Sequence, residues 1–416
     1  MKPYAIYFPQ FYATPTNDAA WGKGFTDWCL VAGANMLDAW PRRAPARGFY
    51  DGASADLHRA HATEAAQAGL GGFAVYHYWF YTHQELGAFE QTLLQAGPGA
   101  ITLPWFLTWA NESWTRRWLG DPRTLVDLTP HPTTAQIERH AEHLARCFAS
   151  PAYLRIDGRP VVFLYLTRTL TGDVAGMLRG ARQVLAARGF DPYFIGDEVY
   201  WRVTPEQPGP GQPTLTTSPQ VPRIEQLDAV TSYILYFSDP AHPALGPTRD
   251  SSGYPGTTAI AADQKLLLAE YRAATGGLVP VVPDVAVGFN DRGFRLGTNH
   301  PAQPRQWTPQ DGPASTLDHF FRCVAAPELD PKLPMVMVTS WDDWNEDTGV
   351  EPIRGLPTRR DDSPSGDAYT QGYEYGHEGR SAVGVLRRDV GLLDAARRGP
   401  TSPTGRRAAS LLMAGC

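Results

Sequence analysis

The feature that most constrains this chain is a series of short apolar runs, rich in β-branched and aromatic residues, that recur at wide intervals. These runs are apolar throughout rather than alternating with polar residues, which is typical of strands buried on both faces of a parallel sheet. Each run is bounded by Pro, Gly or Asp. The runs number eight and occupy residues 4–8, 71–78, 101–108, 160–166, 192–197, 228–234, 279–285 and 335–341.

Segments with helical periodicity lie between most of the runs. We expect helices at 54–68, 84–96, 134–149, 173–188, 258–274, 314–326 and 381–395. Residues 203–223 contain six prolines and no periodicity, so they are expected to form a long loop.

Strand and helix therefore alternate eight times, which predicts an α/β fold: a single (β/α)₈ TIM barrel with long βα loops. A doubly wound sheet is the alternative, but the first run is followed by FPQFYATP (8–15) instead of a glycine-rich phosphate turn. We assign residues 1–396 to the barrel as a catalytic domain. Residues 397–416, rich in Arg, Gly, Ser and Pro, are expected to form a disordered tail, and 354–367 a polar loop over the barrel mouth.

Composition excludes several classes of function. The formal net charge of −6 offers no basic field for phosphates, so no nucleic-acid partner is expected. No apolar run approaches the roughly 18 residues of a membrane span, and no secretory leader is recognisable, which favours a cytoplasmic protein. The four cysteines form no CxxC pair, which disfavours a disulfide framework or a zinc ribbon and favours a reducing compartment. The oligomeric state is left open.

The densest group of chemically active residues follows the eighth run, where the active sites of barrel enzymes lie. The sequence WDDWNEDTGVEP (341–352) holds five carboxylates in ten residues. Asp343 and Glu346 are three residues apart, and in a helical turn they would project on the same side with Cβ atoms roughly 5–6 Å apart. That separation fits a retaining pair of glycosidase carboxylates better than an inverting one. A solvated acidic loop and a Mg²⁺ or Ca²⁺ site are the alternatives, and we assign no metal here.

Three further blocks combine aromatic and polar side chains near strand ends. The third strand ends in WANESW (109–114), and the second in YHYWF (76–80). The first βα loop carries WGKGFTDW (21–28). Tryptophan offers a flat apolar face for a sugar ring, whereas Asn and Glu bond its hydroxyls. The candidate substrate-binding residues are Trp109, Asn111, Glu112, Tyr78, His77, Trp341, Trp344, Glu351, Asp27, Trp28 and Asp342.

Other polar residues near strand ends are weaker candidates: Asp197, Glu198, Asp284, Asn290 and Asp291. The histidines at 58 and 61, and at 140 and 143, lie in helices whose polar faces should meet solvent, so no metal site is expected there. The chain has no GxSxG elbow, HExxH, Walker loop or dinucleotide fingerprint, and no cofactor is expected.

Together, YFPQFY (7–12), WGKGFTDW, YHYWF, WANESWTRRW (109–118) and WDDWNEDTGVEP resemble the WbsX-type, glycoside hydrolase family 99-like proteins. The resemblance implies a (β/α)₈ barrel that acts on carbohydrate. The hydrolase family comprises retaining endo-acting α-mannosidases and mannanases. In these enzymes one carboxylate takes the proton of the sugar 2-hydroxyl, giving a 1,2-anhydro intermediate, while a second protonates the leaving oxygen.

The resemblance also implies roles for individual residues. The family motif reads Trp-Asn-Glu-Trp-x-Glu-Gly, so Glu346 matches the general acid and Asp343 stands where the base Glu should be. The chain departs from the motif at Asp342, Asp343 and Asp347, which replace Asn, Glu and Gly. The replacement at 343 shortens the base by one methylene.

The leading hypothesis is therefore a cytoplasmic glycoside hydrolase that cleaves α-mannoside-like linkages of an oligosaccharide or polysaccharide. A glycosyltransferase of cell-surface polysaccharide assembly is the second hypothesis, and a catalytically inactive glycan-binding barrel is the third.

Overall fold

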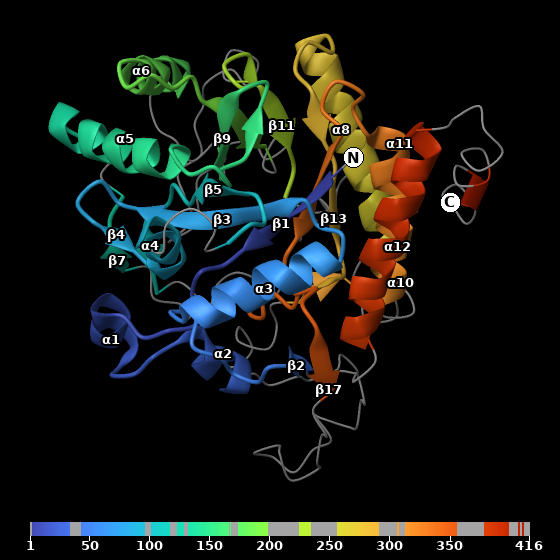
Figure 1. Ribbon diagram of the computed structural model, residues 1–416, viewed down its shortest axis with the longest axis horizontal. Helices are drawn as coiled ribbons and strands as arrows, with labels where there is room; N and C mark the ends of the chain where they lie inside the picture. Colours follow the sequence, from blue (N-terminus) through green and yellow to red (C-terminus); the bar gives the residue numbers. More distant parts are fainter. Residues whose placement is uncertain are drawn as a thin grey trace.

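A ring of parallel strands forms the centre of the computed structural model, and helices surround it (Figure 1). The structure describes residues 2–33, 43–95, 101–116, 123–128, 132–165, 167, 174–198, 224–233, 256–290, 306–307, 313–355, 378–398, 407 and 410–411. The strands of the ring are β1 (Lys2–Tyr7), β3 (Gly72–Trp79), β5 (Trp105–Trp109), β9 (Arg159–Leu164), β10 (Tyr193–Asp197), β11 (Ala229–Thr231), β12 (Val281–Val282), β13 (Asp284–Ala286) and β16 (Met335–Thr339).

Hydrogen bonding runs around the ring in the order β1, β3, β5, β9, β10, β11, β12, then β13, β16 and back to β1. The strands β12 and β13 are two pieces of one strand interrupted at Pro283, because β12 pairs with β11 and β13 pairs with β16. That shared strand joins the two ends of the sheet, so the ring has eight strand positions. All eight predicted strands are confirmed, and with them the (β/α)₈ barrel.

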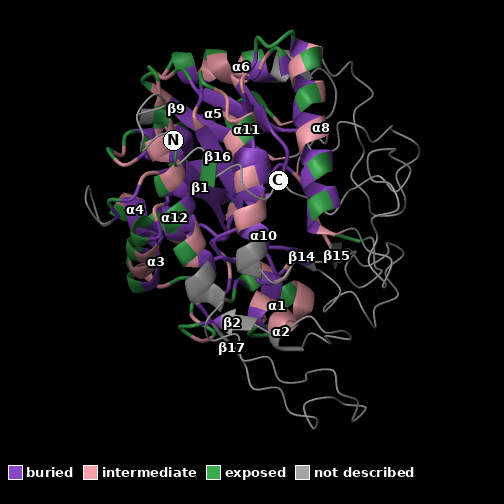
Figure 2. Cartoon of the chain, turned by 90° about the vertical axis from the view of Figure 1, so that its right-hand side faces the viewer, coloured by how far each residue is buried: buried purple, intermediate pink, exposed green. Residues whose placement is uncertain are grey.

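The predicted helices are also present. They are α3 (Ala55–Gln67), α4 (Ala88–Gln95), α5 (Thr134–Phe148), α6 (Val174–Ala186), α8 (Thr257–Thr275), α10 (Pro313–Phe320) and α12 (Glu378–Arg398). A π-helical turn (Phe321–Ala325) continues α10 into α11 (Ala326–Glu328). Local sequence fixes several ends: the Ser54 hydroxyl accepts from the Leu57 N–H at the start of α3, and Thr133 and Gln136 form a capping box on α5. The strands inside this layer are buried (Figure 2).

Short elements that were not predicted lie in the loops. The first βα connection holds α1 (Pro15–Trp21) and α2 (Asp27–Gly33), each only seven residues long. It also contributes β2 (Arg43–Pro45), which pairs with β17 (Ile353–Gly355) just after the acidic loop. Other short strands are β4 (Gln84–Glu85), β6 (Trp114–Thr115), β7 (Thr124–Val126), β8 (Arg155–Ile156), β14 (Phe289–Asn290) and β15 (Gln306–Trp307).

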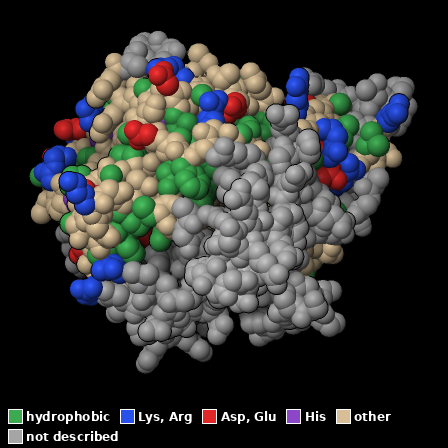
Figure 3. Space-filling model, turned by 90° about the horizontal axis from the view of Figure 1, so that it is seen from below, with side chains coloured by type: hydrophobic (Ala, Val, Ile, Leu, Met, Phe, Trp, Pro, Cys, Tyr) green, Lys and Arg blue, Asp and Glu red, His purple; other side chains and the backbone are tan. Residues whose placement is uncertain are grey.

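Several predictions fall outside the described residues: the proline-rich loop at 203–223, most of the polar loop at 354–367, and nearly all of the tail at 397–416. Among the helices that the structure describes, none has the length and apolarity needed to cross a membrane. On the described part of the face drawn in Figure 3, Lys and Arg side chains lie among Asp and Glu side chains. Cys29 and Cys147 are free thiols, whereas Cys323 is disulfide-bonded, which the cysteine spacing did not predict.

Candidate functional site

Tyrosine rings meet inside the barrel at the C-terminal ends of the strands. Tyr76 on β3 stacks on Phe8, which follows β1, with ring centroids 4.3 Å apart, and it contacts Tyr165, which follows β9, at 5.6 Å. Tyr165 in turn lies 6.2 Å from Tyr233, which follows β11. Since β3, β9 and β11 are not neighbours in the sheet, these contacts cross the interior of the barrel. The rings therefore mark the mouth at which barrel active sites lie.

The acidic loop after β16 folds over this mouth as a tight turn. One oxygen of Asp343, Oδ1, accepts hydrogen bonds of 3.0 Å from the backbone N–H groups of both Asn345 and Glu346. The Asp343 N–H donates to the Ser340 hydroxyl at 2.8 Å. These bonds fix the carboxyl of Asp343 at the start of the turn that carries Glu346.

The two candidate catalytic carboxylates have different surroundings. Asp343 is buried, and that burial raises its pKa well above the ordinary value of 3.8; the neighbouring Glu346 raises the pKa of Asp343 further. Glu346 is half-buried, and its Oε2 accepts a hydrogen bond of 3.0 Å from the hydroxyl of Tyr233. When one carboxyl is buried and its neighbour is more accessible, their pKa values differ, so one of the two can act as an acid and the other as a base.

Asp342 joins the acidic loop to the residue that follows β1. Its Oδ1 accepts a hydrogen bond of 2.8 Å from the backbone N–H of Phe8. Burial, and then the charge of Glu351, raise the pKa of Asp342 well above 3.8. Asp342 thus connects the first and last strands of the barrel directly beneath the mouth.

Glu351 anchors the other end of the acidic loop. Its Oε1 accepts hydrogen bonds of 2.7 Å from both the Trp344 indole N–H and the Tyr50 hydroxyl, and its Oε2 lies 3.3 Å from Nε2 of His61. All of these groups except Tyr50 are fully buried. Glu351 therefore supports the loop instead of offering its carboxylate to the mouth.

The three tryptophans predicted here as sugar platforms have their faces in packing contacts. Trp28 stacks on Phe11 at 4.1 Å, and both belong to one small apolar cluster with Trp344 and Ile353. Trp341 is fully buried in the main core. The packing of these indoles holds the acidic loop against the first βα connection. Their role is therefore structural, and their faces do not line the mouth.

Other predicted residues do surround the mouth. Asp27 on α2 accepts a hydrogen bond of 2.8 Å from the side-chain amide of Asn345, and burial raises the pKa of Asp27. Burial raises the pKa of Tyr78 on β3 well above 10, and the charges of Asp27, Asp343 and Glu112 raise the same pKa further. Tyr78 also lies 5.3 Å from the half-buried ring of Trp114. The structure therefore brings Asp27, Asp343 and Glu112 within electrostatic range of Tyr78.

His77 and Trp109 do not reach this mouth. His77 alternates with Tyr76 and Tyr78 along β3 and so points to the opposite, outer face of the strand, where its ring bonds Glu90 on α4. Trp109 donates its indole N–H to the backbone carbonyl of Trp79, also outside the ring. Asn111 is buried just after β5.

The expectation that the paired histidines face solvent is wrong. His58 and His61 on α3, and His140 and His143 on α5, are all buried against the outer face of the barrel. The polar pattern was misleading because the rings have buried carboxylates beside them: Glu90 is hydrogen-bonded to His143, and Oε2 of Glu351 lies 3.3 Å from Nε2 of His61.

The weaker candidates near strand ends are buried and bonded to neighbouring elements. Asp197 accepts from the backbone N–H of Tyr233 at 3.1 Å, Thr167 bonds Glu198, and Thr339 donates to Asp284 at 2.6 Å. The side chain of Asn290 and all of Asp291 lie outside the described residues.

Two residues of the mouth, Tyr165 and Tyr233, are missing from the residues predicted for the site. Tyr165 is the next-to-last residue of PVVFLYL and Tyr233 the next-to-last residue of DAVTSYI, so each lies near the carboxyl end of a predicted strand run. Their position near the carboxyl ends of barrel strands is the sequence feature from which they could have been predicted.

The comparisons with known proteins fit this geometry. Residues 3–232 match the model of a family described as glycosyltransferase WbsX. The chain belongs to this family. It is 29% identical over 370 residues to a Xanthomonas campestris pv. campestris protein described as "Uncharacterized protein WxcX", covering 84% of this chain and 47% of that protein. The chain thus spans about half the length of the curated relatives it matches.

Solved structures show the same fold at low sequence identity. The GH99 endo-α-mannosidase of Bacteroides thetaiotaomicron in complex with bis-tris-propane superposes with a TM-score of 0.53 at 15% identity, covering 96% of this chain and 98% of that one. A structure described as a glycoside hydrolase-like protein superposes with a TM-score of 0.55 at 15% identity, covering 94% of each chain. This WbsX family member therefore shares the barrel fold of these two solved structures.

Proposed function

We propose that this protein is a retaining glycoside hydrolase of the endo-α-mannosidase type. The observation that carries the proposal is the placement of two carboxylates on one turn at the barrel mouth, with Asp343 buried and Glu346 bonded by Tyr233. An oligosaccharide or polysaccharide with α-mannoside-like linkages would be the substrate. The WbsX family membership and the GH99-like barrel support this assignment.

The two carboxylates would divide the chemistry between them. Glu346, the more accessible of the pair, would protonate the leaving oxygen of the glycosidic bond. Asp343 would accept the proton of the sugar 2-hydroxyl, whose oxygen attacks the anomeric carbon and forms a 1,2-anhydro intermediate. Water would then open that ring, with Glu346 taking its proton and Asp343 returning a proton to the 2-hydroxyl, which retains the anomeric configuration.

The raised pKa of Asp343 suits this role. A general base works best when its pKa lies near the working pH, and burial beside Glu346 moves the pKa of Asp343 in that direction. Asp343 is one methylene shorter than the Glu of the family motif. The sugar would therefore have to sit deeper in the mouth, closer to the ring of Tyr76, Tyr165 and Tyr233.

The set of residues that we propose to contact the sugar is smaller than the set predicted from the sequence. Tyr78, Asp27 and Glu112 remain the proposed sugar contacts, because they lie in the electrostatic surroundings of the mouth. We add the half-buried Trp114, whose indole lies 5.3 Å from the ring of Tyr78, to the proposed sugar contacts.

A glycosyltransferase is the second candidate, favoured by the description of the family itself. Such an enzyme would bind a nucleotide-diphosphate sugar, and the same two carboxylates would serve an acceptor hydroxyl. Measurable affinity for a nucleotide-diphosphate sugar, together with none for free oligosaccharide, would favour this candidate over the hydrolase.

The test of the hydrolase is the Glu346→Gln variant, assayed for release of reducing ends from α-mannosidic oligosaccharides. We expect turnover to fall by at least about 10²-fold, the scale of general acid catalysis, with oligosaccharide affinity retained. Glu142→Gln is the matched control, since Glu142 is an exposed side chain of α5. An unchanged rate in Glu346→Gln would remove Glu346 from the mechanism.

A further inference from the structure

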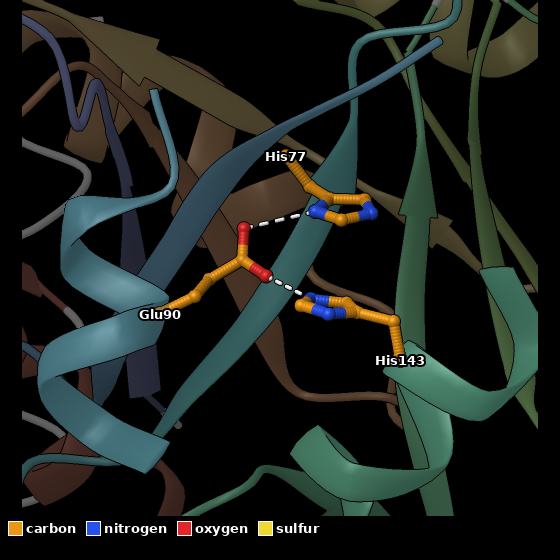
Figure 4. A group of neighbouring side chains, drawn as sticks. All are labelled: His77, Glu90 and His143. Atoms are coloured by element: carbon orange, nitrogen blue, oxygen red, sulfur yellow. Dashed lines mark hydrogen bonds and ion pairs between the residues drawn. The ribbon is translucent and has the colours of Figure 1, made fainter. Parts of the chain in front are cut away.

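A second cluster of chemically active side chains lies outside the ring of strands, on the face of β3 opposite the mouth. It consists of His77 on β3, Glu90 on α4, and His143 and Cys147 one turn apart on α5. All four are buried. Figure 4 shows the two imidazole rings converging on the carboxylate of Glu90 from different elements.

We propose that His77, Glu90, His143 and Cys147 bind one structural zinc ion that fastens α4 and α5 to the outside of the barrel. The proposal is independent of the proposed function, because it uses none of the residues of the mouth. Zinc is the metal that this donor set suits, since it accepts imidazole nitrogen, carboxylate oxygen and thiolate sulfur together in closed four-coordinate sites.

The spacing of the donor atoms supports the proposal. Nδ1 of His77 lies 2.8 Å from Oε1 of Glu90, and Nε2 of His143 lies 2.5 Å from Oε2. One donor atom from each of these three residues falls within 4.8 Å of the others. With bonds of about 2.0 Å, the ligand atoms of a tetrahedral zinc site are roughly 3.3 Å apart, so small side-chain movements would bring all three onto one ion.

Cys147 supplies the fourth ligand. Its Sγ lies 3.6 Å from Nε2 of His143 and 4.0 Å from Oε2 of Glu90. With a zinc–sulfur bond of about 2.3 Å, the sulfur and nitrogen atoms of a tetrahedral site are separated by roughly 3.5 Å. The thiol, one helical turn after His143, therefore lies beside two of the three other donors. The group whose donor atoms fall within 4.8 Å of one another is His77, Glu90 and His143, so Cys147 would have to shift toward His77 to complete the site.

The surroundings of the cluster would hold the ligands in orientation. Nε2 of His77 lies 3.1 Å from Nε2 of His140. If His77 binds the ion through Nδ1, its Nε2–H can donate a hydrogen bond to His140. The side-chain amide of Gln84 donates to Oε1 of Glu90 at 2.8 Å. A ligating histidine with a bonded second nitrogen and a ligating carboxylate with its own donor are both regular features of zinc sites.

The alternative to a metal site is a network of hydrogen bonds, in which protons on the histidine rings bridge to the carboxylate of Glu90 and no ion is bound. Arg146 reaches Nδ1 of His143 at 3.2 Å, an arrangement that leaves a proton on Nε2 to bridge to Glu90. Zinc would replace that bridging proton, and the exposed side chain of Arg146 would turn away from His143. The two descriptions therefore differ in metal content, which can be measured directly.

The experiment is elemental analysis of the full chain, produced without a histidine tag in zinc-supplemented medium and passed through gel filtration. We expect about one zinc per chain in the wild type and less than about a tenth in His143→Gln and Cys147→Ser. His83→Gln is the matched control, because His83 is a partly exposed histidine that pairs with Glu85 outside the cluster. Zinc content that is zero in the wild type, or unchanged in both cluster variants, would overturn the proposal.

A second measurement covers the case in which the variants fail to fold. The wild-type chain refolded with Co²⁺ alone should show the visible absorption of tetrahedral cobalt together with a thiolate-to-cobalt charge-transfer band. A refolded wild-type protein that lacks both features contradicts a site containing Cys147.

Discussion

The hydroxyl of Tyr233, just after β11, donates a hydrogen bond of 3.0 Å to Oε2 of Glu346, on the loop that follows β16. The two residues are 113 positions apart in the chain and meet across the barrel mouth. A bond of this kind fixes the direction of a carboxylate that would otherwise rotate freely at a half-exposed position. Tyr233 is thus a positioning residue for the proposed general acid.

Replacing this tyrosine by phenylalanine should slow turnover without unfolding the protein. A hydrogen bond to a charged group contributes about 1.5–3 kcal/mol, so we expect kcat in Tyr233→Phe to fall on the order of 10-fold or more, with a smaller change in KM. Tyr193→Phe is the matched control, because the Tyr193 hydroxyl donates to the backbone carbonyl of Asp228, away from the mouth. Equal rates in the two variants would show that Glu346 needs no help from Tyr233.

The buried carboxyl of Asp342 should make stability depend on pH. Its pKa is raised in the folded state, so the unfolded chain releases this proton at a lower pH than the folded chain does. The resulting contribution to stability is present below the ordinary carboxyl pKa and is lost as pH rises through the raised value. Asp342→Asn cannot ionise and keeps the oxygen that accepts from Phe8.

We therefore expect a higher urea midpoint for Asp342→Asn than for the wild type at neutral pH, and a difference that shrinks toward zero in acid. Urea titrations at several pH values would measure it. The exposed Asp56→Asn serves as control. The prediction would be contradicted if Asp342→Asn had a lower urea midpoint than the wild type at neutral pH and the two midpoints converged in acid.

Asp347 occupies a backbone conformation that favours glycine. Its φ is +56°, in the left-handed region, and the family motif has Gly at this position. Asp347→Gly and Asp347→Ala both remove the carboxylate, so their difference reports the backbone alone. We expect the Ala variant to be less stable than the Gly variant by about 1 kcal/mol. Equal free energies of unfolding in urea would contradict this assignment of strain.

Glu351 should be the residue of the acidic loop most costly to remove. Glu351→Ala leaves the buried indole N–H of Trp344 and the half-buried hydroxyl of Tyr50 without their acceptor, and His61 without its ion-pair partner. We expect a loss of about 3–5 kcal/mol in the free energy of unfolding, whereas Glu142→Ala on the surface should stay within about 0.5 kcal/mol. A small effect of Glu351→Ala would show that the loop is held by its tryptophans alone.

Much of the fold could be predicted because each strand of a parallel barrel is apolar on both faces. PVVFLYL and MVMVTSW are recognisable without any partner, and Ser54 and Gly69 mark the limits of α3. The short helices α1 and α2 carry too few residues for a periodic pattern. Their positions depend on contacts with distant segments, such as Asp27 with Asn345.

The candidate site was only partly predictable, for a physical reason. The spacing of Asp343 and Glu346 is local, so the turn between them followed from the sequence. The direction of a strand side chain depends on alternation, which places Tyr78 in the mouth and its neighbour His77 outside it. Treating YHYWF as one block hid that difference. The hydrogen bond between Tyr233 and Glu346 forms only when the strands close into the barrel, so no nearby sequence pattern could predict it.

The most direct test of the central claim is a crystal structure of the Glu346→Gln variant with an α-mannosidic oligosaccharide. We predict a sugar ring at the mouth whose 2-hydroxyl lies about 3 Å from the carboxylate of Asp343, with the glycosidic oxygen at the amide of residue 346. A sugar bound without contact to either residue, or a cation held between Asp343 and residue 346, would contradict the account.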